Sequence, residues 1–416
     1  MDRIQIQKVF RPLREVMIEA LYFWSRCKEY YHDPIHFKVH VAALIQALRN
    51  VTFRLQSLKS YIPQFDLWYD RWRSYFRQDP YMKWANEARL DIVHREGLES
   101  KSRAKFRILY SYDEPIVFER DVPPNLSTYT IYQIAKRSIP NDFKHHCLIE
   151  IERYWVVEDF PSIELLHLTR YVFKVLLAMY KDLLQFLIQH ELRDPATLVS
   201  IEPEPQSLMP ISESYRRLRI KAATDQVFDL EEKHVMYSAS EALPTLMRRY
   251  PNLAKLAPLS EHDPASFAEA LLPLAMAVLK RDGFHVPILW LRTNRKKWNL
   301  FVLMPEEQVD KYIIWDHIAK HVEARRADAI VFISEAWMAP LKSLETQPIP
   351  NISHAKGRKE VLQIYAEDAD GKVHCIMIPF RRILGRVLIH RPFRDNTPAN
   401  FVLPVRRVWG TWRHGH

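Results

Sequence analysis

The sequence predicts an α+β fold: an N-terminal helical bundle that carries a β-containing insertion, and a C-terminal mixed α/β sheet domain. Three observations support this prediction. Apolar residues recur every three or four positions through most of residues 4–100, which is typical of amphipathic helices. Short alternating runs typical of strands fall in residues 105–157 and again in residues 285–379. Between these regions four prolines mark residues 194–214 as a linker, so we expect domains at 1–193 and 215–416.

Four helices are predicted in the first hundred residues. The first spans residues 4–31, where Pro12 either bends the helix or marks its true start. Asp33-Pro34 is an N-cap followed by a proline at the first helical position, and an apolar stripe then continues to residue 58. A third helix fits residues 66–77. Asp79-Pro80 repeats the cap signal and opens a fourth helix, which ends near Gly97.

The rest of the chain alternates between strands and helices. In the first domain, strands are predicted at residues 105–112, 116–120 and 146–157, with helices at 127–138 and 162–191. In the second domain, helices are predicted near residues 238–250, 264–282 and 305–325. Its predicted strands are residues 285–291, 298–303, 329–333, 360–367 and 373–379.

Composition limits the classes of function. The chain has 416 residues, 48% of them hydrophobic and 26% charged, which describes a folded protein rather than a disordered one. Its formal net charge of +10 favours polyanionic partners such as nucleic acid. Neither a cysteine pair with zinc-site spacing nor a glycine-rich phosphate loop is present. We therefore expect no metal, no nucleotide cofactor, no membrane-spanning segment, and a reduced, cytoplasmic location.

Arg89 and His94 are the candidate catalytic residues. The guanidinium stays charged near neutral pH and the imidazole titrates there, so the pair could cut RNA without a metal. His94 would take the 2′-hydroxyl proton and Arg89 would stabilise charge on the phosphate. Residues five apart on a straight helix diverge by about 140°, so convergence needs a bend or a second chain. Asp91 is a possible orienting group, or simply an ion-pair partner of Arg95 on the surface.

The helical run that ends in Ala-Arg89-Leu-Asp-Ile-Val-His94 resembles the HEPN superfamily, whose signature is an arginine followed by a histidine after a short spacer. The resemblance implies a metal-independent endoribonuclease of a bacterial toxin–antitoxin or phage-defence system. It also implies a homodimer, 2′,3′-cyclic phosphate products, and an antitoxin or defence-system partner. Leu90 stands where active members usually carry a polar residue. That departure favours the alternative, a non-catalytic HEPN-like scaffold that dimerises and binds nucleic acid.

Basic clusters in the second domain predict contact with RNA. From residue 381 to the end there are eight arginines, no lysine and one acidic residue. Interleaved aromatic residues such as Trp409 could stack on bases. A solvated rim, or a tail that docks on an acidic patch, is the alternative. The predicted nucleic-acid-binding residues are Arg292, Arg295, Lys296, Lys297 and Trp298 in a hairpin turn, together with Arg381, Arg382, Arg406 and Arg407.

Two further groups of residues bear on metal chemistry. His317 and His321 share a helical face, but Ile318 stands where a zinc protease needs glutamate, which indicates a solvated helix face. Carboxylates such as Asp328 and Glu367 could in principle build a two-metal nuclease site. Both lie near predicted chain reversals, where acidic residues are expected for turn chemistry. A metal-dependent nuclease in the second domain is therefore a third hypothesis.

Overall fold

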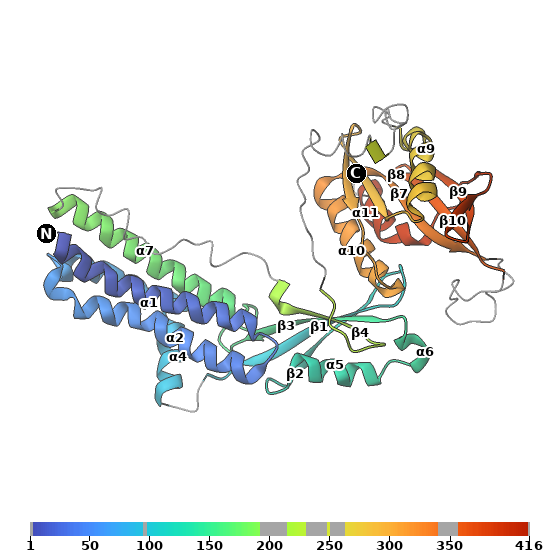
Figure 1. Ribbon diagram of the computed structural model, residues 1–416. Coiled ribbons are helices and arrows are strands. Elements are labelled where there is room, and N and C mark those ends of the chain that lie inside the picture. The colour runs from blue at the N-terminus through green and yellow to red at the C-terminus, as the bar shows by residue number, and fades with distance from the viewer. Residues whose placement is uncertain are drawn as a thin grey trace. The chain divides into compact units, whose positions relative to one another are not determined.

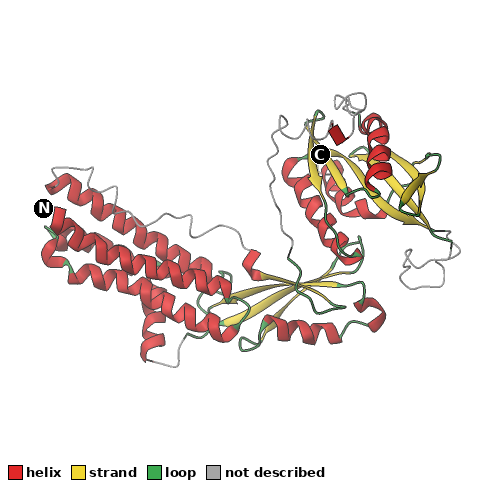
Figure 2. Cartoon of the chain, viewed as in Figure 1, coloured by secondary structure: helices red, strands yellow, loops and turns green. Residues whose placement is uncertain are grey.

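The computed structural model describes residues 3–94, 98–191, 214–229, 248–249, 263–339 and 357–414 (Figure 1). The chain divides into two compact units, and each unit combines several stretches of sequence. The first unit holds residues 1–107, 117–138 and 149–220, and the second holds 108–116, 139–148 and 221–416. Helices and strands both contribute substantially, so the predicted α+β class is confirmed (Figure 2). The domain bounds 1–193 and 215–416 stay a prediction.

A bundle of helices forms most of the first unit (Figure 1). Its apolar faces share one core, in which Trp24 and Trp68 are buried. The indole Nε1 atoms of Trp68 and Trp72 both donate to Asp182 Oδ2, each at 2.8 Å, and this carboxylate ties α3 to α7. The helices are α1 (Arg3–Glu29), α2 (Pro34–Ser57), α3 (Phe65–Gln78), α4 (Pro80–His94) and α7 (Leu165–Glu191), with the 3-10 turn η1 (Lys59–Tyr61) after α2.

Both predicted N-caps are confirmed. The Asp33 carboxylate accepts hydrogen bonds from the backbone N–H groups of Ile35 and His36, with Pro34 at the first helical position. Asp79 accepts in the same way from Tyr81 and Met82. Aspartate at this position satisfies helix N–H groups that would otherwise lack partners, so these two residues fix where α2 and α4 begin.

A four-stranded sheet follows the first bundle helices, in the order β2-β1-β3-β4. Its edge strand β4 was not predicted, because residues 215–233 show no clear period. Charge explains the pairing: Arg219 Nε lies 2.6 Å from Glu150 Oε2 on β3, and Arg107 on β1 lies 2.8 Å from Glu150 Oε1. The elements are β1 (Lys101–Leu109), β2 (Ile116–Val122), α5 (Thr128–Arg137), α6 (Asn141–Lys144), β3 (Leu148–Val156), η4 (Ser214–Arg216) and β4 (Arg217–Lys221).

The second unit contains a seven-stranded antiparallel sheet in the order β10-β9-β8-β7-β5-β6, with β11 also pairing with β9. Alternate residues face opposite cores: Val331 packs with α9 on one side, and Ile330 packs with α10 and α11 on the other. The elements are α9 (Pro264–Asp282), β5 (Ile288–Thr293), β6 (Lys297–Val302), α10 (Gln308–Arg325), β7 (Ala327–Met338), β8 (Lys359–Asp368), β9 (Val373–Ile383), β10 (Arg386–Ile389), β11 (Phe393–Asp395), η8 (Asn400–Val402) and α11 (Leu403–His414).

The C-terminal segment differs from its prediction. Residues 386–414 form β10, β11 and α11 rather than an extended basic surface. Trp409, expected to stack on bases, is buried, and its Nε1 donates to the backbone oxygen of Ala327 at 2.9 Å. The aromatic residues between the arginines are thus partly core residues. Two other predictions, the linker at 194–214 and most of the helix near 238–250, lie outside the described residues.

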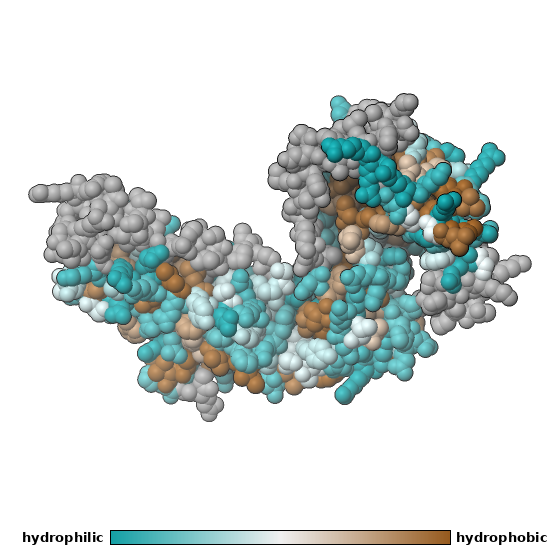
Figure 3. All heavy atoms as spheres, in the orientation of Figure 1, coloured by the Kyte–Doolittle hydropathy of each residue, from teal (hydrophilic) through white to brown (hydrophobic). Residues whose placement is uncertain are grey.

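Hydrophobic residues reach the visible face in separate patches among hydrophilic ones (Figure 3). Within the part of the chain that the structure describes, no helix is long and apolar enough to cross a bilayer.

Candidate functional site

The predicted pair Arg89 and His94 lies at the C-terminal end of α4. Arg89 is half-buried, and its guanidinium carbon sits 5.5 Å from the ring centroid of Phe53 on α2. His94 is exposed at the last position of the helix. Five positions on one helix rotate the side chains about 140° apart. The two residues therefore project in different directions, and Asp91 lies between them on the same helix.

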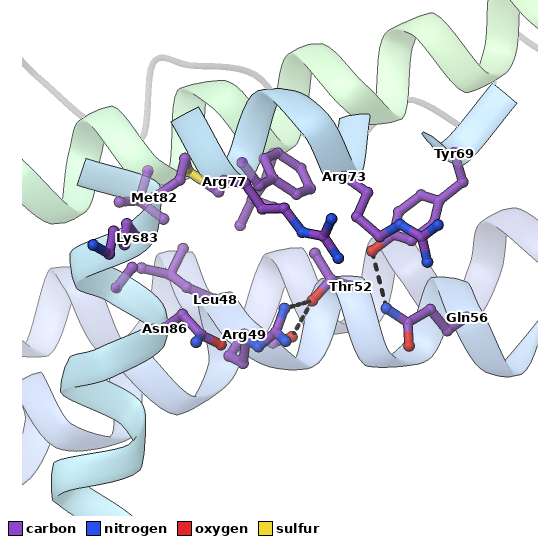
Figure 4. Close-up of a pocket in the computed structure, with 14 residues that line it drawn as sticks. Leu48, Arg49, Thr52, Gln56, Tyr69, Arg73, Arg77, Met82, Lys83 and Asn86 are labelled. Carbon is purple, nitrogen blue, oxygen red and sulfur yellow. Dashed lines mark hydrogen bonds between the residues drawn. The ribbon is translucent and has the colours of Figure 1, made fainter. Parts of the chain in front are cut away.

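A cationic pocket lies next to Arg89, among helices α2, α3, α4 and α7 (Figure 4). Its volume is about 300 Å³. Its lining combines apolar side chains with hydrogen-bond donors. The residues that line it are Leu48, Arg49, Thr52, Gln56, Tyr69, Arg73, Phe76, Arg77, Met82, Lys83, Ala85, Asn86, Val172 and Leu176.

Helical spacing brings the donors together. On α3, Tyr69, Arg73 and Arg77 recur every four residues, so they share one face of that helix. On α2, Arg49, Thr52 and Gln56 follow one another at spacings of three and four residues, which places them on one face as well. Figure 4 shows Arg73 and Arg77 extending from α3 toward these residues of α2, while Lys83 lies at one end of the pocket on α4 with its amine directed away from them.

The charge on this pocket is not balanced. Arg49, Arg73, Arg77 and Lys83 line it, and among the described residues no acidic side chain does. Two of the cations have carboxylate partners outside the pocket: Arg73 Nη2 lies 2.6 Å from Asp70 Oδ1, and Lys83 Nζ lies 4.0 Å from a Glu87 oxygen. Within the described ranges, neither Arg49 nor Arg77 forms an ion pair.

Arg49 shows most clearly how the positive charge is crowded. Its Nη1 donates to Thr52 Oγ1 at 2.6 Å, whereas its buried Nε has no hydrogen-bond partner among the described residues. Its guanidinium carbon lies 4.5 Å from the Phe53 ring centroid, so Phe53 contacts both Arg49 and Arg89. Burial lowers the pKa of Arg49, and the charge of Arg89 lowers it further, while Tyr69 acts in the opposite direction.

These groups can hold an anion. Arginine presents planar, forked donors that match the oxygens of phosphate or carboxylate, and several of them surround one cavity here. Among the described residues that line it there is no histidine, cysteine or carboxylate, the side chains that most often transfer protons near neutral pH. The arrangement therefore favours binding over acid–base chemistry.

A second pocket of the first unit is larger, about 450 Å³, but most of the charged residues that line it already have partners. Arg103 lies 3.5 Å from Glu119 and 3.7 Å from Asp121, and both it and Glu119 line this pocket. Buried Glu164 also lines it. Its carboxylate accepts from the His167 backbone N–H at 3.0 Å, at the start of α7. Glu164 thus serves as a helix cap, and we rank this pocket below the first.

The structure separates the predicted RNA-binding residues of the second unit. The turn with Arg295, Lys296 and Lys297 follows β5, whose last residue Thr293 pairs with the first residue of β7. The register then places Arg381 and Arg382 at the opposite end of the sheet, next to Phe380, which pairs with the start of β8. The nine residues therefore do not form one continuous surface through the strands.

Ion pairs within the fold also occupy several of these cations. Arg292 Nε lies 2.8 Å from Asp328 Oδ1, and Arg406 Nε lies 2.6 Å from Glu367 Oε1. Arg382 binds Glu335 at 2.6 Å and also contacts Glu360. Two further residues make other contacts: Arg407 Nη1 donates to the Tyr112 backbone oxygen at 3.3 Å, and the Trp298 ring stacks on Phe267 at 4.5 Å.

The proposed metal groups are not assembled in the described residues. The Nε2 atoms of His317 and His321 lie 3.2 Å apart on α10. Asp328 and Glu367 bind arginines, as described above. No cluster of three or more histidine, cysteine, aspartate or glutamate side chains that could hold a metal occurs in the ranges that the structure describes.

Fold and site together define a class: an α+β protein with a cationic pocket among the helices of a bundle. The chain belongs to the family described as bacteriophage lambda protein ea47, whose family model matches residues 4–414. It is similar to Protein ea47 of Escherichia phage lambda, with 24% identity over 378 residues that cover 88% of each chain. No solved structure matches it.

The family corrects the resemblance drawn from the sequence. The HEPN prediction was wrong, because a single phage family accounts for the whole chain and nothing in it points to a HEPN domain. It rested on one short motif, and an arginine and a histidine at that spacing arise readily by chance. The predictions that depended on this resemblance are wrong as well. They are the endoribonuclease function, its toxin–antitoxin or defence setting, and the HEPN-like scaffold.

Proposed function

We propose that the first unit binds a phosphate-bearing anion in the pocket among α2, α3, α4 and α7. The observation that carries this proposal is the unbalanced lining: four cations and no acid, with Arg49 and Arg77 lacking a carboxylate partner among the described residues. Arg49 is partly buried, whereas Arg73, Arg77 and Lys83 are exposed, and a bound anion would offset the repulsion among these like charges.

Such a ligand would link α2 to α3. Arg49 lies on α2 and Arg77 on α3, so one anion that contacts both holds these two helices together. Anything that binds only the folded state raises the free energy of unfolding by mass action. The expected result is a bundle whose stability increases with phosphate concentration.

Titration of the full chain with inorganic phosphate tests the proposal. Replacing Arg77 by glutamine removes a charged donor, and we expect affinity to fall about tenfold. Arg54→Gln is the matched control, because Arg54 lies on α2 and does not line the pocket. Equal phosphate affinity for wild type, Arg77→Gln and Arg54→Gln, or no binding by wild type, would refute the site.

Two partners expected from the sequence remain predictions. Arg295, Lys296 and Lys297 are exposed in the β5–β6 turn, and we propose this turn as the place where RNA would contact the second unit. The second predicted partner is another copy of the chain, in a homodimer formed through the helical bundle. Analytical sedimentation of the purified chain tests this prediction.

A further inference from the structure

The lining of the cationic pocket also contains information about the size and shape of its ligand. Apolar side chains from all four helices line the pocket together with the donors, and Figure 4 shows Leu48 and Met82 at the end of the pocket near Lys83. Such apolar side chains make no favourable contact with an inorganic anion, so they favour a ligand that also has an apolar part. The apolar residues that line the pocket are Leu48, Phe76, Met82, Ala85, Val172 and Leu176.

The number of uncompensated cations limits the ligand's charge. Asp70 and Glu87 partly balance Arg73 and Lys83, which leaves Arg49 and Arg77. A phosphate monoester carries about −1.5 to −2 charges near pH 7, which matches two guanidinium groups. A phosphodiester carries only about one negative charge per phosphate.

The volume limits the ligand's size. Pockets that enclose small molecules run from about 300 to 1,000 Å³, and this one, at about 300 Å³, is at the lower end. There is room for one phosphate and a small body, and the polar groups of Thr52, Gln56 and Asn86 border the same space.

Resting on the proposed anion site, we infer that its ligand is a phosphate monoester with a small apolar body. Arg49 and Arg77 bind the phosphate, and the apolar side chains cover the organic group. The dianion is needed for full affinity. Its second ionisation lies near pH 6, so binding weakens as the pH falls through that value.

Four probes separate this inference from the site itself. Phenyl phosphate supplies both parts, inorganic phosphate the anion alone, phenol the body alone, and methyl phenyl phosphate a diester with one charge. We expect phenyl phosphate to bind full-length protein about tenfold more tightly than inorganic phosphate, since burying roughly 60 Å² of apolar surface has that effect. The diester should bind at least about tenfold more weakly than phenyl phosphate, because one charge-assisted contact is lost.

A variant of the apolar lining adds an independent measurement. Val172→Thr puts a hydroxyl among the apolar side chains, so it should weaken phenyl phosphate and leave inorganic phosphate unchanged. Equal affinities of wild type for phosphate and phenyl phosphate, or for phenyl phosphate and the diester, would overturn the inference while the anion site stands. Failure of both phosphate and phenyl phosphate to bind would overturn both proposals.

Discussion

Phe53 shows how a single residue can organise charge. The guanidinium carbons of Arg49 and Arg89 lie 4.5 and 5.5 Å from its ring centroid. An aromatic face attracts cations, so the ring holds two like charges near each other at the edge of the pocket. Arg89, singled out from the sequence for catalysis, is thus placed where it strengthens the positive potential around an anion.

His94 provides a test at the same scale. It is exposed at the end of α4 and does not line the pocket. We expect His94→Ala to leave phosphate affinity within about twofold of wild type, because an exposed side chain contributes little. Arg89→Gln should weaken it by a few-fold through the lost potential. Titration calorimetry of the two variants decides, and a larger loss for His94→Ala would contradict the assignment.

Glu164 predicts a pH dependence of stability. Burial raises the pKa of its carboxyl from 4.5 to about 7, although hydrogen bonds from the backbone and from Tyr31 oppose the shift. Because the folded pKa is raised, this group contributes stability that is complete below pH 4.5 and is lost as the pH rises through 7.

Glu164→Gln should remove that dependence. Relative to the variant, wild type should lose up to about 3 kcal/mol of unfolding free energy between pH 4.5 and 7, and little more above. Urea unfolding at a series of pH values measures this. A constant difference between the two proteins across the range would show that Glu164 is ionised throughout.

At the scale of elements, Asp182 joins α3 to α7. It accepts from Trp68 and Trp72, and Arg71 Nη2 lies 3.1 Å from the same oxygen. Removing it leaves two indole N–H groups without their partner. We expect Asp182→Ala to cost about 2 kcal/mol of stability and to weaken phosphate binding, since α3 carries Arg73 and Arg77.

The matched control is Asp66→Ala on the same helix. Asp66 pairs with Lys59 at 2.7 Å, but both side chains are well exposed, so the pair contributes little. Thermal unfolding should separate the two variants clearly. Similar melting temperatures for Asp182→Ala and Asp66→Ala would rule out the proposed link between α3 and α7.

Local sequence signals fixed some elements well. Asp33-Pro34 and Asp79-Pro80 located the starts of α2 and α4, and α9 has the predicted bounds because Asp263 caps it and Gly283 ends it with φ 80°. Strand β4 and helix α11 depend on partners far away in the chain, such as Glu150 and Ala327. Short windows of sequence do not contain those partners.

The pocket was missed for the same reason. Arg49, Arg77 and Lys83 are spread over three helices, and each looks like an ordinary solvated charge when read along its own helix. One partial signal was present in the Tyr69, Arg73, Arg77 repeat on α3, which sets two cations and a phenol on one face. Only packing of the helices reveals that no acid faces them.

At the scale of the whole molecule, the predicted domain boundary at residue 193 can be tested by removing β4. A fragment of residues 1–193 lacks Arg216 and Arg219, which lie 3.3 and 2.6 Å from buried Glu152 and Glu150. Glu150 keeps Arg107 as a partner in this fragment, at 2.8 Å, whereas Glu152 loses both Arg216 and Arg217. Removing one partner of a buried ion pair typically costs about 3–5 kcal/mol, so we expect the fragment to unfold at markedly lower urea than residues 1–229. Equal urea midpoints for the two fragments would support a domain boundary at residue 193.

The interleaving of the two units has a consequence for inheritance. The backbone passes from one unit to the other after residues 107, 116, 138, 148 and 220. No single break in the gene therefore yields two products that each encode one complete unit. A recombination junction inside the coding region would therefore split at least one unit, so the two units are inherited together.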